Sequence, residues 1–277
     1  MRIGILILAA LAALYLYCIM PRMFHRPDMA PLRSRYFAHR GLHDIALGIP
    51  ENSLPAFQRA VDQGFGIELD LHLTKDGVPV VFHDFHLKRM TGEEGDVEDY
   101  TLKELRSFRL AGTNEQIPTL SEVLTLVDGK VPLLIEYKTE SPDIRVCPVS
   151  EEQLKYYHGS YCVESFNPIA MRWYKKHRPD IVRGQLSDKM LHYKQFRTAK
   201  LFLGALCLQG MVTNVFSRPD FIAFDIKFKN LSRFLDRKLF GSVSAGWTVK
   251  SREELCQARH SYDVFIFEDF VPDRSAS

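Results

Sequence analysis

Residues 66–84 read GIELDLHLTKDGVPVVFHD, and they contain two apolar runs joined by a short polar turn. In the first run, Glu68 and Asp70 alternate with apolar neighbours. Because strand side chains alternate between faces, both carboxylates point to one side of a half-buried strand. The turn at residues 74–77 leads directly into the second run, which ends on His83. The stretch therefore predicts a strand, a turn and a second strand.

Two other segments have the same design, Phe37-Ala38-His39-Arg40-Gly41 and Leu134-Ile135-Glu136-Tyr137-Lys138. Each begins as an apolar run and ends in charged or titratable groups. This pattern is typical of an active site at the C-terminal rim of parallel strands. Glu136 and Lys138 share one face of their strand. Two neighbouring strands would then direct three carboxylates and one ammonium group into one space.

Eight short apolar runs from Tyr36 onward are candidate barrel strands: Tyr36–His39, Gly66–Leu73, Pro132–Tyr137, Tyr161–Ser165, Val182–Leu186, Phe221–Asp225, Val243–Thr248 and Val264–Glu268. Helical patterns fall between most of them, at Ser53–Gln63 (capped by Asn52 or Ser53), Leu120–Val127, Leu154–Tyr157, Pro168–His177, Lys189–Thr198, Leu231–Leu239 and Arg252–Arg259. This alternation predicts an α/β fold, a (β/α)8 TIM barrel. A doubly wound open sheet is the alternative, but the chain has no G-x-G-x-x-G loop to support it.

Residues 84–117 interrupt the alternation. They form a polar segment after the second strand and its hairpin, in which we expect little apolar core. We interpret the segment as a small insertion on the active-site rim that helps to define the substrate mouth.

The N-terminus differs from the rest of the 277-residue chain, because residues 3–20 contain no charged side chain and Pro21 ends the run. Such a run is close to the roughly 17–25 residues that span a bilayer. A cleaved signal peptide would end in small residues, whereas this run ends in bulky ones, so an uncleaved anchor is favoured. Tyr15 and Tyr17 suit the membrane interface.

The expected organisation is an anchor helix at 1–20, a linker at 21–34 and a barrel at 35–272. One arginine, Arg2, precedes the apolar run, and four follow it: Arg22, Arg26, Arg33 and Arg35. By the positive-inside rule, this excess places the barrel on the cytoplasmic side.

The net charge of +2 gives no support for nucleic-acid binding. The five cysteines include no C-x-x-C pair, which argues against a zinc site or a disulfide framework.

The residue types suit phosphodiester cleavage. Glu68, Asp70 and Glu136 offer hard oxygen ligands, which favour Mg²⁺ or Ca²⁺ over a soft metal. Arg40 and Lys138 can hold a phosphate, Arg40 through its planar fork and Lys138 as a point charge. His39 and His83 suit general acid and base roles, because an imidazole titrates near neutral pH.

An ordered set of motifs closely resembles the glycerophosphodiester phosphodiesterase family over most of residues 36–270. The motifs are His39-Arg40-Gly41, Pro50-Glu51-Asn52-Ser53, Glu68-x-Asp70, Thr74-Lys75-Asp76-Gly77, His83-Asp84, Ile117-Pro118-Thr119-Leu120, Glu136-Tyr137-Lys138, Ser165-Phe166-Asn167 and Trp247-Thr248-Val249. Single motifs are weak, but the set in this order is specific.

The resemblance implies metal-dependent hydrolysis of a glycerophosphodiester to glycerol 3-phosphate and an alcohol, through a cyclic phosphate. It also implies that His39 and His83 transfer protons, in an order that stays open, and that the three carboxylates bind the divalent ion. Glu51 follows the family pattern as a further metal or substrate ligand, ranked below them. We consider Trp247 equally as a packing residue and as a wall for glycerol or the headgroup, while His43, His72 and His86 have no motif role.

Three functions compete. The first is hydrolysis of soluble glycerophosphodiesters. The second is a lysophospholipase D acting on lysophospholipids, which the anchor favours; a polyglycerolphosphate polymer is a related substrate if the domain faces outward. The third is a catalytically silent, membrane-tethered binding module, although no ligand or histidine of the set is missing. The last strand ends in Glu268-Asp269, where the family has a small polar residue and Asp, and this departure bears on headgroup specificity. Protein partners stay open.

Overall fold

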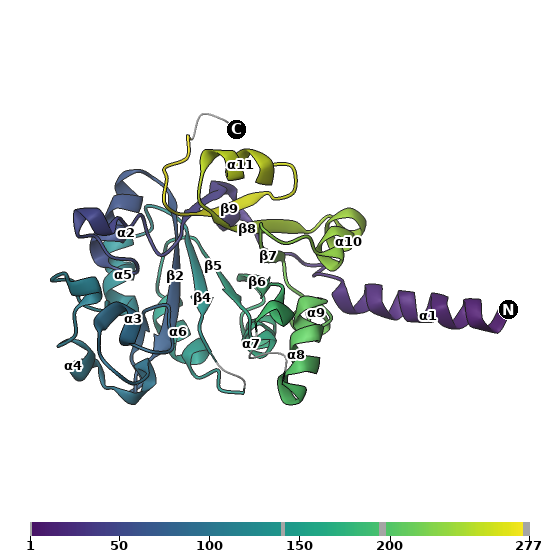
Figure 1. Ribbon diagram of the computed structural model, residues 1–277, viewed down its shortest axis with the longest axis horizontal. Helices are drawn as coiled ribbons and strands as arrows, with labels where there is room; N and C mark the ends of the chain where they lie inside the picture. Colours follow the sequence, from purple (N-terminus) through teal and green to yellow (C-terminus); the bar gives the residue numbers. More distant parts are fainter. Residues whose placement is uncertain (1, 140–141, 194–197, 274–277) are drawn as a thin grey trace.

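The structure is a computed structural model that describes residues 2–139, 142–193 and 198–273 (Figure 1). Eight parallel strands form a closed barrel, because the first pairs with both the second and the last. The strands in barrel order are β1 (Tyr36–Ala38), β2 (Gly66–Leu73), β4 (Leu133–Tyr137), β5 (Tyr161–Ser165), β6 (Val182–Ser187), β7 (Phe221–Asp225), β8 (Val243–Val249) and β9 (Val264–Phe267). The TIM-barrel prediction is confirmed, and each strand ends within a residue of its predicted bounds.

The predicted hairpin after β2 is also confirmed. Strand β3 (Pro79–Val81) pairs antiparallel with β2, with Leu71 opposite Val81. The turn is stabilised by Thr74, whose hydroxyl oxygen accepts a hydrogen bond of 2.9 Å from the amide of Val78. Gly77 adopts a φ of +80°, which a side chain would disfavour. The hairpin places His83 at the same rim as the ends of β1, β2 and β4.

The expectation of little core in residues 84–117 is wrong. The segment folds into α3 (Lys88–Thr91), the 3₁₀ helices η3 (Val97–Asp99) and η4 (Leu110–Gly112), and α4 (Leu102–Leu105). Apolar side chains from these elements form a separate small core with Val80 and Phe82; they are Leu87, Met90, Val97, Leu105, Leu110 and Ile117. These residues are spaced singly among polar residues, so no periodic pattern in the sequence predicts that they form a core.

Most of the helices lie where they were predicted. They are α2 (Leu54–Asp62), α5 (Leu120–Val127), α7 (Pro168–His177), α10 (Leu231–Phe240) and α11 (Arg252–Ala258). Ser53, not Asn52, caps α2 by accepting a hydrogen bond from the amide of Ala56. Thr119 and Glu122 form a capping box at the start of α5.

Two helices differ from the prediction. Helix α6 spans Val146–Leu154 rather than Leu154–Tyr157, because Pro148 lies in its first turn, where proline is tolerated. The segment predicted as a helix at Lys189–Thr198 contains the 3₁₀ helix η5 (Met190–His192), and residues 194–197 lie outside the described residues. The longer helix α8 (Ala199–Gln209) follows, and then the short α9 (Asn214–Ser217).

Helix α1 (Arg2–Ile19) projects away from the barrel, and only its last turn contacts it (Figure 1). Ile19 is fully buried against Met211 and Ile222. Of the described helices, α1 is long and apolar enough to cross a membrane. The segment that follows includes η1 (Ala30–Ser34), from which Leu32 packs into the apolar cluster that also holds Phe37.

Candidate active site

The inward face of the barrel changes character along each strand. Leu134 on β4 and Cys162 on β5 belong to the apolar cluster inside the barrel. Two residues further along, on the same face, lie Glu136 and Glu164, which are direct neighbours in the strand register. Asp70 on β2 is the register partner of Glu136 on its other side. The alternation of the sequence thus builds an apolar floor with carboxylates above it.

Three predicted carboxylates converge on one point. One oxygen from each of Glu68, Asp70 and Glu136 lies within 4.8 Å of the others, and all three side chains are buried. The ammonium group of Lys138 lies 3.1 Å from Asp70 Oδ1 and 2.7 Å from Glu136 Oε1. The structure therefore brings together the three predicted metal ligands and one predicted phosphate-binding residue.

The electrostatics of this cluster fit a divalent cation. Burial, together with repulsion from Asp70 and Glu136, raises the pKa of Glu68 well above its usual range. Burial likewise raises the pKa of Glu136. For Asp70, burial opposes ionisation, but the charges of Lys138, His83 and Arg40 outweigh it and lower its pKa. A bound divalent ion would remove the mutual repulsion, and a set of hard oxygen donors suits Mg²⁺ or Ca²⁺.

Arg40 is held in a tight turn directly after β1. It adopts a left-handed backbone conformation with φ 56°, and its amide donates a 2.9 Å hydrogen bond to Glu68 Oε2. Gly41 follows with φ +80°, and a Cβ there would lie 2.9 Å from the backbone of Ala56 in α2. Glycine is therefore required for the turn to pack against α2. These contacts explain why arginine and glycine follow His39 directly.

The segment before α2 supports the same turn. Asn52 donates a 2.8 Å hydrogen bond from its side-chain amide to Asp70 Oδ2. Glu51 pairs with Arg40 at 2.8 Å and with Arg89 of the insertion at 2.7 Å. Glu51 thus contacts the predicted phosphate-binding arginine rather than the three clustered carboxylates.

Each predicted catalytic histidine has its Nδ1 atom against a carboxylate. His39 Nδ1 is hydrogen-bonded to Glu268, and His83 Nδ1 lies 2.6 Å from Asp84 Oδ1. Burial and the charge of Arg40 lower the pKa of His39 to about 4. A neutral His39 must donate its Nδ1–H to the carboxylate, so its Nε2 atom carries the free lone pair.

Sequence analysis did not assign a role to Glu268, and the structure places it directly behind His39. Burial opposes its ionisation, but hydrogen bonds from His39, His43 and Lys250 outweigh burial and lower the pKa of Glu268. Glu268 follows the apolar run of β9, in the same way that the charged residues Glu136 and Lys138 lie at the end of the apolar run of β4. The sequence signal was therefore present, and the departure from the family pattern at this position touches a predicted catalytic residue.

Both histidines line a cavity of about 460 Å³ at the C-terminal rim of the barrel. One side, here called the charged wall, consists of His39, Arg40, Glu68, His83, Glu136, Lys138 and Glu164. The other side, here called the apolar wall, is mainly apolar but includes Asp188 and Thr248; its remaining residues are Phe166, Leu186, Met190, Tyr193, Trp247 and Ile266. Trp247 packs edge-to-face on Phe166 with ring centroids 5.9 Å apart, and its indole N–H has no hydrogen-bond partner among the described residues.

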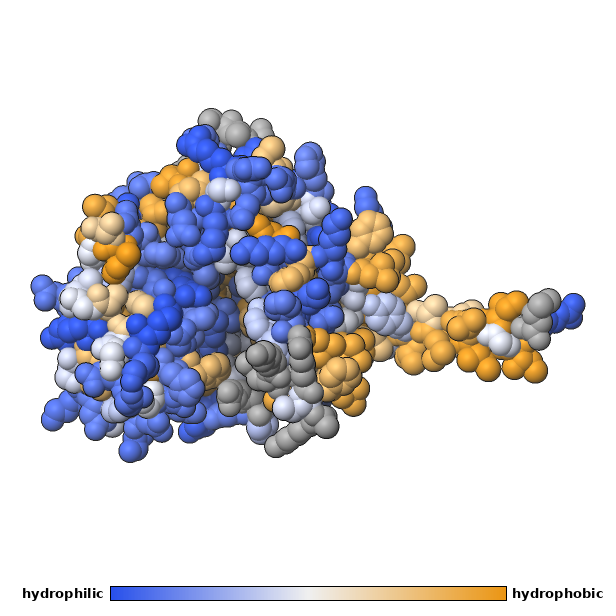
Figure 2. Space-filling model, in the orientation of Figure 1, coloured by the Kyte–Doolittle hydropathy of each residue, from blue (hydrophilic) through white to orange (hydrophobic). Residues whose placement is uncertain are grey.

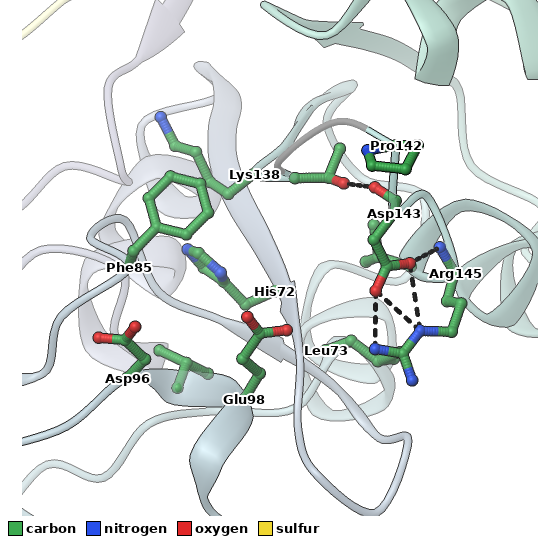
Figure 3. Close-up of a pocket in the computed structure, with 12 residues that line it drawn as sticks. His72, Leu73, Phe85, Asp96, Glu98, Lys138, Pro142, Asp143 and Arg145 are labelled. Atoms are coloured by element: carbon green, nitrogen blue, oxygen red, sulfur yellow. Dashed lines mark hydrogen bonds and ion pairs between the residues drawn. The ribbon is translucent and has the colours of Figure 1, made fainter. Parts of the chain in front are cut away.

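A second hollow of about 270 Å³ shares Lys138 with this cavity (Figure 3). Phe85 stands beside His72, with ring centroids 5.0 Å apart, and the Asp143–Arg145 ion pair lies on the opposite side. His72 Nε2 donates to the carbonyl oxygen of His83 at 3.3 Å, and burial lowers the pKa of His72 to about 4. His72 thus supports the backbone that positions His83.

Comparisons with known proteins point to one family. The model of the Glycerophosphoryl diester phosphodiesterase family matches residues 39–224. A glycerophosphodiester phosphodiesterase of Caldanaerobacter subterraneus subsp. tengcongensis is 35% identical over 169 residues, which cover 56% of this chain and 67% of that protein. Lysophospholipase D GDPD1 of Rattus norvegicus is 33% identical over 171 residues, 56% of this chain but only 53% of that protein.

A solved structure is similar over nearly the whole barrel. The phosphodiesterase of Oleispira antarctica, in complex with the product sn-glycerol-3-phosphate, has a TM-score of 0.67 at 25% identity and covers 85% of this chain and 92% of its own. The family match contains every predicted site residue except Trp247.

Proposed function

The chain belongs to the glycerophosphoryl diester phosphodiesterase family, and we propose that it hydrolyses glycerophosphodiesters at a divalent ion held by Glu68, Asp70 and Glu136. The products are glycerol 3-phosphate and an alcohol. The convergence of the three carboxylates at a cavity lined by both histidines is the observation that carries the proposal.

In the first step, Arg40 and Lys138 hold the non-bridging oxygens of the phosphate. A divalent ion held by Glu68, Asp70 and Glu136 would supply Lewis acidity that polarises the phosphoryl group. His39 is neutral with a free Nε2 atom, so it removes the proton from the neighbouring glycerol hydroxyl. That oxygen forms a bond to phosphorus, the bond to the departing alcohol breaks, and His83 gives its proton to the leaving oxygen.

The second step reverses the roles. His83 takes a proton from water, whose oxygen attacks the cyclic phosphate, and His39 returns its proton to the glycerol oxygen. Glu268 and Asp84 hold the two imidazole rings by their Nδ1 atoms throughout. Glu68, Asp70 and Glu136 stay ionised while the ion is bound, because its charge opposes the repulsion between them.

The test is a panel of diesters with ³¹P NMR analysis of the products. The purified chain should convert glycerophosphocholine or glycerophosphoethanolamine to glycerol 3-phosphate in Mg²⁺ or Ca²⁺, and EDTA should abolish the reaction. Absence of turnover on every diester with both ions would overturn the proposal.

A lysophospholipid is the second candidate substrate. The apolar wall gives a hydrocarbon chain a surface to contact, and the similar rat protein is named a lysophospholipase D. Rates on lysophosphatidylcholine vesicles and on glycerophosphocholine, measured with one enzyme preparation, decide between the two. A strong preference for the soluble diester removes the lipid alternative.

We further propose that α1, within residues 1–20, is a single-pass anchor, that residues 21–34 link it to the barrel of residues 35–272, and that the barrel faces the cytoplasm. The apolar composition of α1 and the arginines that follow it support this arrangement. Cys256 is exposed, so a membrane-impermeant maleimide should label it only after cells are broken. A Cys256→Ser variant controls for the other thiols, and labelling of Cys256 in intact cells would contradict the cytoplasmic orientation.

A further inference from the structure

Large apolar side chains are exposed on three helices around the base of α1. They come from α8, α9 and α10, and together we call them the docking face: Phe202, Leu203, Leu206, Phe216, Leu231 and Phe234. Leu203 is 67% exposed and Leu231 is 70% exposed. Figure 2 shows apolar areas on either side of the point where the apolar α1 leaves the barrel. Large apolar side chains exposed together on three helices indicate a binding partner.

The last turn of α1 is fastened to the helices that present this face. Tyr15 Oη lies 2.6 Å from the hydroxyl of Ser232 in α10, and Asn214 of α9 donates a 3.1 Å hydrogen bond to the carbonyl of Ile19. Arg218 donates a hydrogen bond of 2.7 Å to the carbonyl of Tyr17. The direction of α1 is therefore fixed relative to the docking face, and a bilayer crossed by α1 has to meet that face.

The free length of α1 is too small to span a bilayer alone. Residues 3–14 are all exposed, whereas the turn that follows lies against the barrel. At 1.5 Å per residue, this exposed part rises about 18 Å. The hydrocarbon core of a bilayer is about 30 Å thick. About 12 Å, or two fifths of the thickness, is left over, and the barrel surface beside α1 must enter the membrane to make up the difference.

We propose that the docking face is a bilayer-binding surface, on which α8 and α10 lie in the membrane interface beside α1. The proposal rests on the membrane anchor proposed above. Interfacial helices bury an apolar face roughly 5–10 Å into the boundary between headgroups and acyl chains, which is close to the missing length. A lipid surface is the occupant that this geometry selects, because α1 and the docking face share one side of the barrel.

Charges at the base of α1 suit lipid phosphates. Arg22, Lys175 and Arg218 line a hollow of about 370 Å³ there, and its described lining includes no acidic residue. Phe24 stands at the same place with 80% of its side chain exposed. A basic rim beside an apolar surface is the arrangement that binds anionic headgroups.

Docking would bring the membrane close to the substrate cavity. The inner face of α8 packs through Ala205 and Leu208 against Met190, which belongs to the apolar wall. One helix therefore separates the docking face from that wall.

Depth-dependent quenching of a fluorophore tests the proposal in the full chain. A nitrobenzoxadiazole label is placed at Leu203→Cys on the docking face, at Leu11→Cys in α1, or at Leu47→Cys. Leu47 is a matched control, because it is 64% exposed and lies in the segment between β1 and α2, and α2 lies on the side of the barrel away from α1 (Figure 1). The accessible thiols Cys18, Cys207 and Cys256 are changed to serine, which leaves the buried Cys147 and Cys162. Proteoliposomes contain phosphatidylglycerol, phosphatidylcholine and doxyl-labelled lipid.

The expected result is quenching at positions 203 and 11 that is at least threefold stronger than at position 47. Quenching at position 203 no stronger than at 47 would overturn the proposal, whether or not position 11 is quenched. Quenching at 11 alone would leave the anchor in place without docking of the barrel. Hydrolysis of soluble glycerophosphocholine by the same samples reports on folding and on the proposed enzymatic function separately.

Discussion

The charged and apolar walls of the cavity differ in how firmly their side chains are held. On the charged wall, Arg40 and Lys138 are joined by ion pairs and hydrogen bonds to three carboxylates, those of Glu68, Asp70 and Glu136, and each histidine is fixed by a carboxylate. On the apolar wall, Tyr193 donates a hydrogen bond to Asp188, but the side chain of Trp247 makes ring contacts and leaves its N–H unpaired among the described residues. This difference fits our proposal that the charged wall performs the chemistry, which needs fixed geometry, and that the apolar wall accommodates the variable alcohol.

The largest effect is expected from the clustered carboxylates of the charged wall. In Asp70→Asn, the loss of one negative charge weakens ion binding and leaves Lys138 with one partner fewer. We expect glycerophosphodiester hydrolysis to fall about 10³-fold, as for the loss of a central electrostatic contact. Glu152→Gln, at an exposed position, is the control and should retain full activity. A loss of less than tenfold in Asp70→Asn would contradict the assignment of this wall.

Removal of a proton-transferring group should come next. His39→Ala is expected to lower kcat about 10²-fold with little change in KM, because the imidazole acts in the transition state. Steady-state kinetics on glycerophosphocholine provide the measurement. A variant that changed KM alone would show that His39 binds substrate instead.

Glu268→Gln tests the fixed geometry behind that histidine. We expect kcat to fall about 10- to 100-fold, as for other residues that orient a functional histidine. Because His39 must be neutral to act as base and its pKa is about 4, wild-type kcat/KM should stay level down to about pH 5 and fall below it. Glu268 stabilises protonated His39, so in the variant the acid limb should move to lower pH. If the plateau of kcat/KM fell in the variant but its acid limb stayed at the same pH, Glu268 would have a purely structural role.

A smaller and selective effect is expected on the apolar wall. Trp247→Ala should lower kcat/KM for lysophosphatidylcholine about tenfold, because burial of hydrocarbon against the ring is lost. The rate on glycerophosphocholine should change less than threefold, and Trp247→Phe should recover most of the loss. Equal losses on both substrates would show that Trp247 serves the chemistry, and the distinction between the two walls would then fail at this residue.

The smallest effect concerns the attachment of α1 to α10, outside both walls of the cavity. Tyr15→Phe removes the contact with Ser232 and should reduce the free energy of unfolding by about 0.5–1.5 kcal/mol. Thermal unfolding in detergent would record the change, while hydrolysis of soluble diesters should stay unchanged. A loss of hydrolysis would mean that α1 acts on the cavity as well as on stability.

The two walls also differ in how well the sequence predicts them. The charged wall lies at the ends of apolar runs, where strand alternation alone orients Glu68, Asp70 and Glu136. Its neighbours follow within a few residues along the chain, so local patterns suffice. Glu268 had the same signal at the end of β9, but its contact with His39 depends on barrel closure between β1 and β9, which a single run does not reveal.

The apolar wall and the insertion are harder to predict for a physical reason. Helix α8 is apolar on both its buried and its exposed faces, so its sequence has no clear period to separate a helix from a buried strand. In the insertion, Leu87, Val97 and Leu105 are spaced singly and meet only through tertiary packing. Both regions depend on contacts between segments distant in sequence, whereas the barrel strands follow from local alternation.

The central claim is that three buried carboxylates on adjacent strands bind one divalent ion at the site of cleavage. Isothermal titration calorimetry of Ca²⁺ and of Mg²⁺ into the metal-stripped chain, compared with a Glu68→Gln/Glu136→Gln double variant, tests it most directly. We predict one ion per wild-type chain, and loss of that binding together with hydrolysis in a double variant that still folds. No binding by the wild type, or equal binding by the double variant, would contradict the claim.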